Sequence, residues 1–379
     1  MAIEHDGSAT TSSLWIPGRA DVTVVGAGQA GLSAGFHLIR RGFSQVYQPE
    51  SGSPKEGART FVILDANAGA GGAWQHRWRS LRMMTVNGIY DLPGVPIPHF
   101  DPSEPAVEVV PRYFRAYEAA TGLRPIRPVM VRSVRRLNDD SHGPLLLTTT
   151  AGQLQSLAIV NATGTWTHPF IPYYPGNSEF AGQQLHVAEY VAASFFNGKR
   201  VAVVGGGISA VQLLEEISHV TDTLWFTRSV PQWHDETERF DGVAVVAKVE
   251  ERVAQGLAPG SVVSVTGLFW TPTLRAAAER GVLDRHPMFS RIEATGLRMS
   301  NGDFEPVDVI LWATGFRSAL DHLAPLGLRG SGGGIPVDGT QVRGEPRVHL
   351  VGYGPSASTV GANRAGRAAV NDLVRFLGH

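Results

Sequence analysis

Two segments of this chain follow the same order of apolar strand pattern, glycine-rich turn and helical pattern. In the first segment, residues 21–25 lead into a G-x-G-x-x-G turn formed by Gly26, Gly28 and Gly31. In such a turn the first glycine turns the chain, the second lets the backbone approach a pyrophosphate, and the third allows close helix–strand packing. The pattern predicts a dinucleotide site at the start of the helix that follows.

The same order returns at residues 200–204, which lead into Gly205 and Gly207, with Ala210 at the third position. Alanine is an accepted variant there. One such match is weak evidence, but both copies follow a strand pattern and open a helix pattern. The chain is therefore predicted to be an α/β protein with two doubly wound, Rossmann-like dinucleotide-binding domains.

The residue at the end of the next strand indicates which nucleotide each domain binds. In the first domain the strand pattern at residues 60–64 ends at Asp65, beyond a Gly/Pro/Ser-rich segment that is typical of an inserted loop. An acidic residue in this place binds a ribose hydroxyl group. Asp65 is predicted to bind the ribose of FAD, with Glu50 as the alternative.

In the second domain the strand pattern at residues 223–227 ends at Arg228, which Ser229 follows. A cation here suits the 2′-phosphate of NADP, because a guanidinium offers two parallel donors to a phosphate. A solvated arginine at a strand end is the alternative. The two sites together predict FAD and NADPH in one polypeptide, with NADH as a second usable donor.

The chain contains no cysteine. Disulphides, thiolate metal sites and iron–sulfur clusters are therefore excluded, and so is electron transfer from a flavin to a cysteine pair. The histidines show no metal-ligand spacing, so no metal site is predicted. Oxygen, a quinone or a protein acceptor remains as the destination of the electrons.

Charge and hydropathy exclude two classes of partner. The chain has 33 Lys and Arg against 34 Asp and Glu, so no basic field attracts nucleic acid. No apolar run approaches the length of a membrane span, and residues 1–20 lack the apolar region of a secretory signal. We expect a cytoplasmic protein, with a homodimer as one open oligomeric state.

A second internal repeat predicts where the chain passes between its domains. Two apolar strand patterns each end in an Ala-Thr-Gly triplet, which is Ala162, Thr163 and Gly164 in the first copy and Ala313, Thr314 and Gly315 in the second. The predicted organisation is a disordered extension over residues 1–20, an FAD-binding domain over residues 21–175 and 305–379, and an NADPH-binding domain inserted over residues 176–304.

Residues 180–190 resemble the fingerprint of the class B flavin monooxygenases, the group that contains the flavin-containing and Baeyer–Villiger monooxygenases. They match F-x-G-x-x-x-H-x-x-x-[WY] through Phe180, Gly182, His186 and Tyr190. The resemblance implies that these residues form an interdomain hinge at the cofactors.

Other motifs agree with the same family in order and spacing. Gly72, Ala73 and Trp74 resemble the family's GG-[TS]-W turn over the flavin, and the two Ala-Thr-Gly strands are also family features. Within the family, the chain resembles short bacterial NAD(P)H-dependent flavoproteins that include arsenic-operon monooxygenases.

The resemblance implies a function. NADPH would reduce FAD, and the reduced flavin would capture O2 as a C4a-(hydro)peroxide that inserts one oxygen atom into a small organic substrate, by heteroatom oxidation or Baeyer–Villiger insertion. The protein would mainly orient the cofactors and exclude water. The alternative is an NADPH oxidase or electron-transfer reductase that oxygenates nothing, and a redox sensor without turnover is a third.

The resemblance also implies further site residues. Asn87 falls near the place of an active-site asparagine, and His186 completes the catalytic candidates; a turn-forming Asn-Gly and a structural hinge are the respective alternatives. Thr359 and Val360, before the last helical pattern, are predicted to face the flavin pyrimidine, with a helix cap as the alternative. The remaining predicted cofactor contacts are Gln29, Ala30, Ala66, Val131, Ile208 and Ser209.

Overall fold

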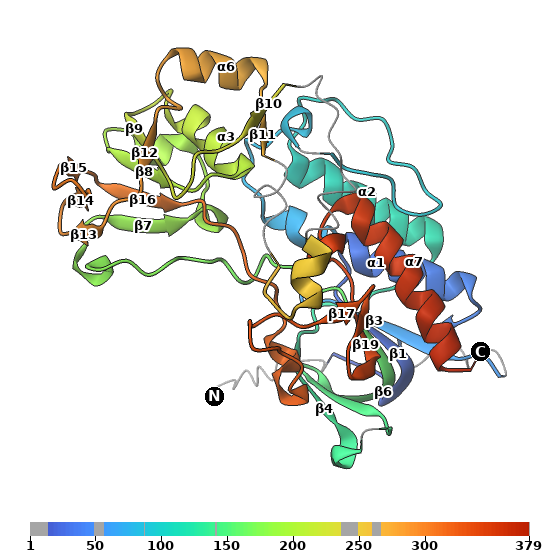
Figure 1. Ribbon diagram of the computed structural model, residues 1–379. Helices are drawn as coiled ribbons and strands as arrows, with labels where there is room; N and C mark the ends of the chain where they lie inside the picture. Colours follow the sequence, from blue (N-terminus) through green and yellow to red (C-terminus); the bar gives the residue numbers. More distant parts are fainter. Residues whose placement is uncertain are drawn as a thin grey trace, which may run out of the picture.

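The computed structural model describes residues 14–48, 57–86, 88–140, 142–235, 249–259 and 267–378. Two separate sheets, the first mixed and the second parallel, each with helices packed against it, make up most of this part of the chain (Figure 1). Asn87 and Glu50 lie outside the described residues, as does the predicted extension up to residue 13.

The first sheet is built around a central apolar strand, β1. This strand pairs in parallel with β3 on one side and with β6 on the other. Val22 and Val24 on one face and Thr23 on the other are fully buried, as expected for a central strand that is covered on both faces. The strand order is β17-β18-β19-β6-β1-β3-β2, and β4 and β5 extend the sheet from β6. These strands are β1 (Arg19–Val25), β2 (Ser44–Gln45), β3 (Thr60–Leu64), β4 (Val131–Arg136), β5 (Leu145–Thr149), β6 (Gly152–Asn161), β17 (Val337–Asp338), β18 (Gln341–Val342) and β19 (Glu345–Leu350).

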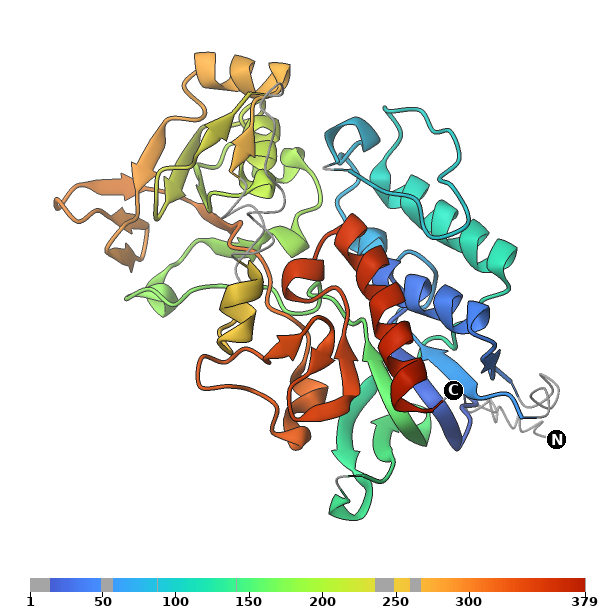
Figure 2. The ribbon, with the colours of Figure 1, turned by 45° about the vertical axis from the view of Figure 1, so that its right-hand side comes forward.

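Three long helices accompany the first sheet: α1 (Gln29–Arg40), α2 (Ala106–Thr121) and α7 (Thr359–Phe376). Helices α1 and α7 lie side by side (Figure 2). A Cβ atom at Gly366 of α7 would lie 2.7 Å from the Ser33 Oγ atom of α1, so the two helices approach closely because this position is a glycine. The C-terminal helix is thereby fixed to the helix that follows the first glycine turn.

The second sheet has five parallel strands in the order β12-β9-β8-β16-β7. They are β7 (Gln183–His186), β8 (Val201–Val204), β9 (Thr223–Thr227), β12 (Arg285–Pro287) and β16 (Val309–Trp312), with α3 (Ile208–Ile217) and α6 (Pro272–Glu279) packed together beside them. Strand β16 pairs with β7 and β8, so this sheet extends past residue 304, the predicted end of the NADPH-binding domain.

Two smaller sheets belong to the same half of the molecule. The antiparallel strands β13 (Arg291–Glu293), β14 (Gly296–Arg298) and β15 (Phe304–Pro306) form one, and β10 (Trp233–His234) and β11 (Leu268–Phe269) form the other. In the chain, the three-stranded sheet lies between β12 and β16.

Two connectors join the halves of the molecule, and they run antiparallel to each other (Figure 1). The first connector follows β6 and comprises residues 162–182, and the second follows β16 and comprises residues 313–320. Their backbones bond at Phe170 N to Gly315 O (3.0 Å), Arg317 N to His168 O (2.8 Å) and Ala319 N to Gly164 O (2.9 Å). The Ala-Thr-Gly segments therefore mark the crossings between the domains, as the repeat predicts.

None of the described helices combines the length and the apolar character that a membrane span requires.

Candidate dinucleotide-binding sites and the domain junction

In the first glycine turn, Gly26 and Gly31 pack against the backbone, whereas Gly28 faces open space. Gly26 has φ +100°, and a Cβ atom there would lie 2.5 Å from the Ala162 carbonyl oxygen. A Cβ atom at Gly31 would lie 1.8 Å from the Gly26 carbonyl oxygen. At Gly28 the nearest atom is the Gly72 Cα, 3.9 Å away. Gly28 is also the N-cap of α1, and no side chain caps that helix, so its amide groups are available to an anion.

The second glycine turn likewise contains one glycine that packs against the backbone and one that faces open space. Gly205 has φ +144°, and a Cβ atom there would lie 2.2 Å from the Ala313 carbonyl oxygen. At Gly207, no atom of the described residues lies within 4 Å of such a position. Gly207 is the N-cap of α3, again without a side-chain cap. Helix α3 begins with Ile208 and Ser209, and Ala210 is fully buried. Both turns thus present free helix amides beside unoccupied space.

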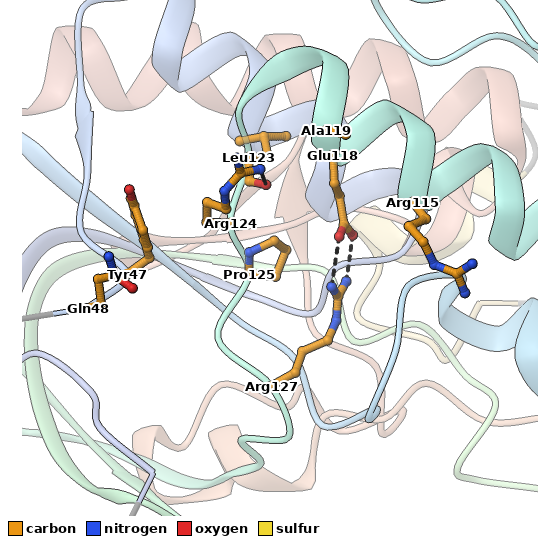
Figure 3. Close-up of a pocket in the computed structure, with 9 residues that line it drawn as sticks. All are labelled: Tyr47, Gln48, Arg115, Glu118, Ala119, Leu123, Arg124, Pro125 and Arg127. Atoms are coloured by element: carbon orange, nitrogen blue, oxygen red, sulfur yellow. Dashed lines mark hydrogen bonds and ion pairs between the residues drawn. The ribbon is translucent and has the colours of Figure 1, made fainter. Parts of the chain in front are cut away.

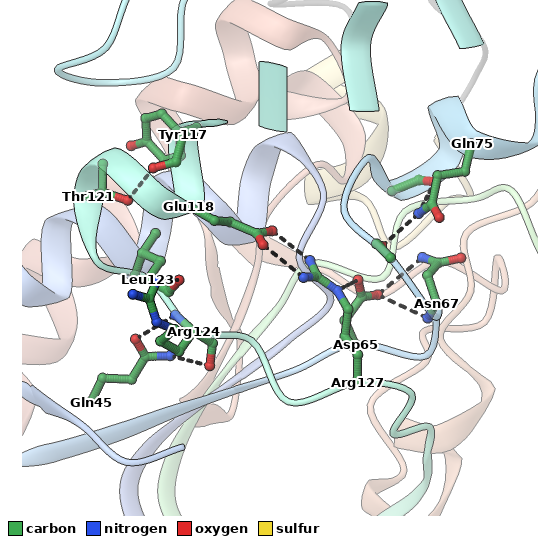
Figure 4. A network of polar contacts seen from close by, with 12 residues as sticks. Gln45, Asp65, Asn67, Gln75, Tyr117, Glu118, Thr121, Leu123, Arg124 and Arg127 are labelled. Atoms are coloured by element: carbon green, nitrogen blue, oxygen red, sulfur yellow. Dashed lines mark hydrogen bonds and ion pairs between the residues drawn. The ribbon is translucent and has the colours of Figure 1, made fainter. Parts of the chain in front are cut away.

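Asp65 lies at the end of β3 and is 4% exposed. Its Oδ2 atom accepts a hydrogen bond from Arg127 Nε (2.8 Å), and its Oδ1 atom accepts one from Asn67 Nδ2 (3.1 Å). The two terminal nitrogens of Arg127 donate to the Glu118 carboxylate at 2.9 and 2.7 Å (Figure 4). Burial opposes the charge of Arg127, but the hydrogen bonds to Glu118 and Asp65 raise its pKa above the usual value. These contacts fix the Asp65 carboxylate at the end of β3, the position predicted for the ribose ligand.

Glu118 and Arg127 also line a pocket of about 550 Å³ (Figure 3). The other lining residues come from the segment after β2, from α2 and from the turn that follows α2: Tyr47, Gln48, Arg115, Ala119, Leu123, Arg124 and Pro125. None of them belongs to a glycine turn or a connector, so this pocket is separate from the junction of the two nucleotide sites.

The predicted flavin turn packs on the first glycine turn. Gly72 has φ +53°, and a Cβ atom there would lie 2.9 Å from the Gly28 Cα atom. Ala73 and Trp74 continue this turn as a short 3₁₀ helix, Gly72–His76. Ala66, the residue after Asp65, is exposed. The structure thus brings the flavin turn at Gly72 against Gly28, which is distant from it in the sequence.

His186 is fully buried at the end of β7. Its Nε2 atom donates to the Gly315 carbonyl oxygen (2.9 Å), and its Nδ1 atom accepts from the Ala188 amide (3.1 Å). Burial lowers the pKa of His186, against the opposing effects of the Gly315 carbonyl and of Glu189. Both ring nitrogens are engaged in the neutral form, and this arrangement favours the alternative of a structural hinge.

The rest of the fingerprint fixes the same region. A Cβ atom at Gly182 would lie 2.3 Å from the Asp308 carbonyl oxygen and 2.6 Å from the Phe180 ring, so only glycine fits there. Tyr190 Oη donates to Glu216 Oε1 (2.8 Å), and Ser80 Oγ donates to Glu216 Oε2 (2.8 Å). Glu216 of α3 therefore joins the last fingerprint residue to a loop of the first domain, a contact that the sequence did not indicate.

The threonines of the crossing segments bond across the connectors. Thr163 Oγ1 donates to the Ala319 carbonyl oxygen (2.7 Å), and Thr314 Oγ1 donates to the Phe170 carbonyl oxygen. Asn161 Nδ2 donates to Thr163 Oγ1 (3.0 Å). These hydroxyl groups hold the two connectors together, so a cofactor contact at these segments falls to the backbone.

Arg228 follows β9 and is exposed. Among the residues that the structure describes, its guanidinium has no hydrogen-bond or ion-pair partner. On the neighbouring strand β12, Arg285 Nε donates to Thr227 Oγ1 (2.7 Å), and the Thr227 residue directly precedes Arg228. Thr227 Oγ1 also donates to the Ser229 carbonyl oxygen (2.7 Å). The strand end is thus ordered by Arg285, and Arg228 is left available for a ligand.

The remaining predicted contacts lie at the edges of the first site. Thr359 and Val360 start α7, whose N-cap Ser358 accepts from the Gly361 amide, so the cap alternative is present. Gln29 Nε2 donates to Asn363 Oδ1 (3.1 Å) and thereby joins α1 to α7, and Ala30 is buried beside it in α1. Val131 is buried at the start of β4. No group of three or more metal-ligating side chains is found in the described part of the chain.

Comparison with known proteins decides the family. Residues 23–267, more than half of the chain, match the family model described as pyridine nucleotide-disulphide oxidoreductase. The solved flavin-containing monooxygenase from Stenotrophomonas maltophilia is 34% identical, with a TM-score of 0.78 over 95% of this chain and 100% of that chain. The chain belongs to the flavin monooxygenases of this family.

Two curated relatives are more distant. They are the indole-3-pyruvate monooxygenase YUCCA1 of Oryza sativa subsp. japonica, 29% identical over 52% of this chain, and a Baeyer-Villiger monooxygenase of Streptomyces coelicolor, 27% identical over 56% of this chain. The chain spans 44% and 38% of the lengths of these two proteins.

Family membership confirms several predictions made from the sequence. It confirms the resemblance to flavin monooxygenases, the α/β fold with two dinucleotide-binding domains, the flavin-dependent oxidoreductase class, and FAD and NADPH as the cofactors. Placement near the arsenic-operon monooxygenases stays a prediction.

Proposed function

We propose that this flavin monooxygenase uses NADPH, FAD and O2 to insert one oxygen atom into a small organic substrate, by heteroatom oxidation or Baeyer–Villiger insertion. The observation that carries the proposal is the pair of uncapped helix N-termini at Gly28 and Gly207, joined through one pair of connectors. Such N-termini favour the diphosphate of a dinucleotide. The first glycine turn would hold FAD, and this cofactor would supply the chemistry of accepting a hydride from NADPH and giving the electron pair to O2.

The chain's own residues divide the binding task. Gly28 and Gly207 give two diphosphates access to helix amides, and Asp65 accepts hydrogen bonds from the FAD ribose. Arg228 pairs with the 2′-phosphate of NADPH. His186 holds β7 against the second connector through the Gly315 carbonyl group, so it positions the junction between the cofactors without exchanging a proton.

The absence of cysteine excludes one class of electron acceptor, a cysteine pair of the protein itself. A flavoprotein that reduces disulphides passes its electrons through a cysteine pair, and this chain has none. With O2 as acceptor, NADPH, a proton, O2 and the substrate give NADP⁺, water and the oxygenated product. Asn87 remains our candidate for a residue beside the reacting oxygen.

The proposal is tested by tracing oxygen from labelled O2. The purified holoenzyme is supplied with NADPH, ¹⁸O2 and a panel of sulphides, amines and ketones. We expect at least one product with a single ¹⁸O atom, formed in proportion to the NADPH consumed. Hydrogen peroxide equal to the NADPH consumed, with no labelled product from any compound, would favour the NADPH oxidase or reductase alternative.

Location and assembly are part of the proposal. A cytoplasmic location and a homodimer remain predictions from the sequence. Cell fractionation and sedimentation velocity would test them, and membrane-bound activity or a single monomeric species would contradict them.

A further inference from the structure

Arg77 lies in an aromatic environment where the flavin turn meets both connectors. Its guanidinium carbon is 4.6 Å from the centroid of the Trp166 ring and 5.7 Å from that of the Trp74 ring. The Trp166 ring stacks on Phe316 with 5.0 Å between centroids. Trp74 belongs to the flavin turn, whereas Trp166 and Phe316 belong to the two connectors. Arg77 is therefore a cation at the point where three cofactor-related segments converge.

Within the described part of the chain, the guanidinium of Arg77 has no anionic partner. Its Nε atom is buried without a hydrogen-bond partner, and no ion pair of Arg77 is found among the residues that the structure describes. Burial alone lowers the pKa of Arg77 to about 10. Contact with two aromatic rings recovers only part of the free energy lost when the cation leaves water.

Two other arginines with largely buried side chains show how such a charge is normally compensated in this protein. The Arg127 side chain is 11% exposed and pairs with Asp65 and Glu118. The Arg347 side chain is 3% exposed and pairs with Glu345. Because buried charges in proteins are paired, Arg77 is expected to meet its anion in a ligand.

We propose that Arg77 binds a phosphate oxygen of a dinucleotide, whose diphosphate supplies the missing negative charge. A guanidinium presents parallel donors that match phosphate oxygens. The turn before Arg77 packs on Gly28, where the FAD diphosphate is expected, and the aromatic neighbours lie on the connectors that lead to the NADPH domain. FAD and NADPH offer the same chemistry, and the test separates them.

The test measures nucleotide binding by Arg77→Gln and Arg77→Lys proteins. FAD affinity is measured by reconstitution of the apoprotein, and NADP⁺ affinity by the change it causes in the flavin spectrum of the holoenzyme. We expect Arg77→Gln to weaken one of the two by about ten- to a hundredfold, and Arg77→Lys to restore part of the loss. A weaker FAD complex assigns the contact to FAD, and a weaker NADP⁺ complex assigns it to NADPH.

A stability measurement separates ligand binding from a structural role. In Arg77→Met the unpaired charge is absent, so the apoprotein should unfold at an equal or higher temperature than wild type, while the temperature gain on adding nucleotide should shrink. A lower unfolding temperature of the apoprotein with an unchanged gain would overturn the proposal. So would unchanged affinity for both nucleotides in Arg77→Gln.

Arg79→Gln is the matched control. It removes the same charge two positions away, from a side chain that is 77% exposed and paired with Glu108, and it should change neither affinity. The inference rests on the proposed binding of FAD and NADPH. Because its readouts are binding constants, a wild-type enzyme that released only peroxide would refute the proposed oxygenation without deciding the role of Arg77.

Discussion

At the scale of single residues, the glycines of the first turn differ in whether the fold can accommodate a side chain in their place. A side chain at Gly28 enters open space, whereas a side chain at Gly31 meets the Gly26 carbonyl oxygen. We therefore expect Gly28→Val to fold normally but to lose FAD, because the valine occupies the space of the diphosphate. The FAD content should fall at least about tenfold, with near wild-type circular dichroism. Gly31→Val should fail to fold, and a yellow, stable Gly28→Val protein would contradict the assignment.

Arg228 carries the coenzyme prediction. Because it is exposed at the end of β9 and available for a ligand, Arg228→Ala should raise the KM for NADPH by about ten- to a hundredfold, while the KM for NADH stays within about twofold. Steady-state kinetics with both coenzymes checks this expectation. Equal losses for the two would show that the guanidinium does not contact the 2′-phosphate.

Single-residue features were predictable where chemistry follows local order. Asp65 and Arg228 are proposed as nucleotide ligands because each ends a strand that follows a glycine turn. The partners Arg127 and Glu118 were not predicted, because they lie more than 50 positions from Asp65 and their ion pairs exist only in the folded chain. The sequence did not indicate Arg77 as a ligand for the same reason, because the Trp166 ring that it contacts comes from a distant segment of the chain.

At the scale of elements, the connectors depend on a buried neutral histidine. His322 Nε2 donates to Asn161 Oδ1 (2.7 Å) beside the first crossing, and burial lowers its pKa from 6.5 to about 4. Below pH 6.5 the unfolded chain binds a proton that the folded chain excludes, so stability is full above this pH and falls as the pH drops toward 4. The slope is up to about 1.4 kcal/mol per pH unit for one histidine.

Thermal unfolding between pH 7 and pH 4.5 measures this dependence. Wild-type protein should lose stability on acidification, and His322→Gln should show a shallower loss, because glutamine keeps a donor near Asn161 and does not titrate. His349, which burial also affects, keeps part of the slope in the variant. An unchanged slope in His322→Gln would show that His322 is not neutral in the folded state.

The contact between α3 and the first domain makes a second prediction for an element. Tyr190→Phe removes one of the two hydrogen bonds that Glu216 accepts. We expect the free energy of unfolding to fall by about 1.5–3 kcal/mol and the rate of flavin reduction by NADPH to fall, with FAD content unchanged. Tyr173→Phe is the control, since Tyr173 is 83% exposed. Wild-type reduction rates in Tyr190→Phe would show that the contact does not position the NADPH domain.

Regular elements were easier to predict than their sheet membership. Strands β1 and β8, which precede the two glycine turns, lie where the apolar runs of the sequence predict them. Strand β16 was assigned to the first domain by its order in the chain, but it pairs with β7 and β8. Pairing is set by contacts across the sheet, and a run of four apolar residues carries no information about which sheet receives it.

At the scale of the whole molecule, the two nucleotide domains are joined by antiparallel connectors that bond to each other along their lengths. Their hydroxyl groups, the His186 contact and Glu216 all restrict how the domains can move. In the proposed function, these part-buried polar contacts would keep two bound cofactors in a fixed relation while water is excluded.

The central claim, oxygen insertion after flavin reduction by NADPH, is tested most directly by rapid mixing. The yellow holoenzyme is reduced with NADPH without air and mixed with oxygenated buffer while the flavin spectrum and the peroxide yield are followed. We predict a spectral species distinct from reduced and oxidised flavin, which outlasts mixing and decays faster with a substrate. Direct return to oxidised flavin with one peroxide per flavin, with or without substrate, would contradict it.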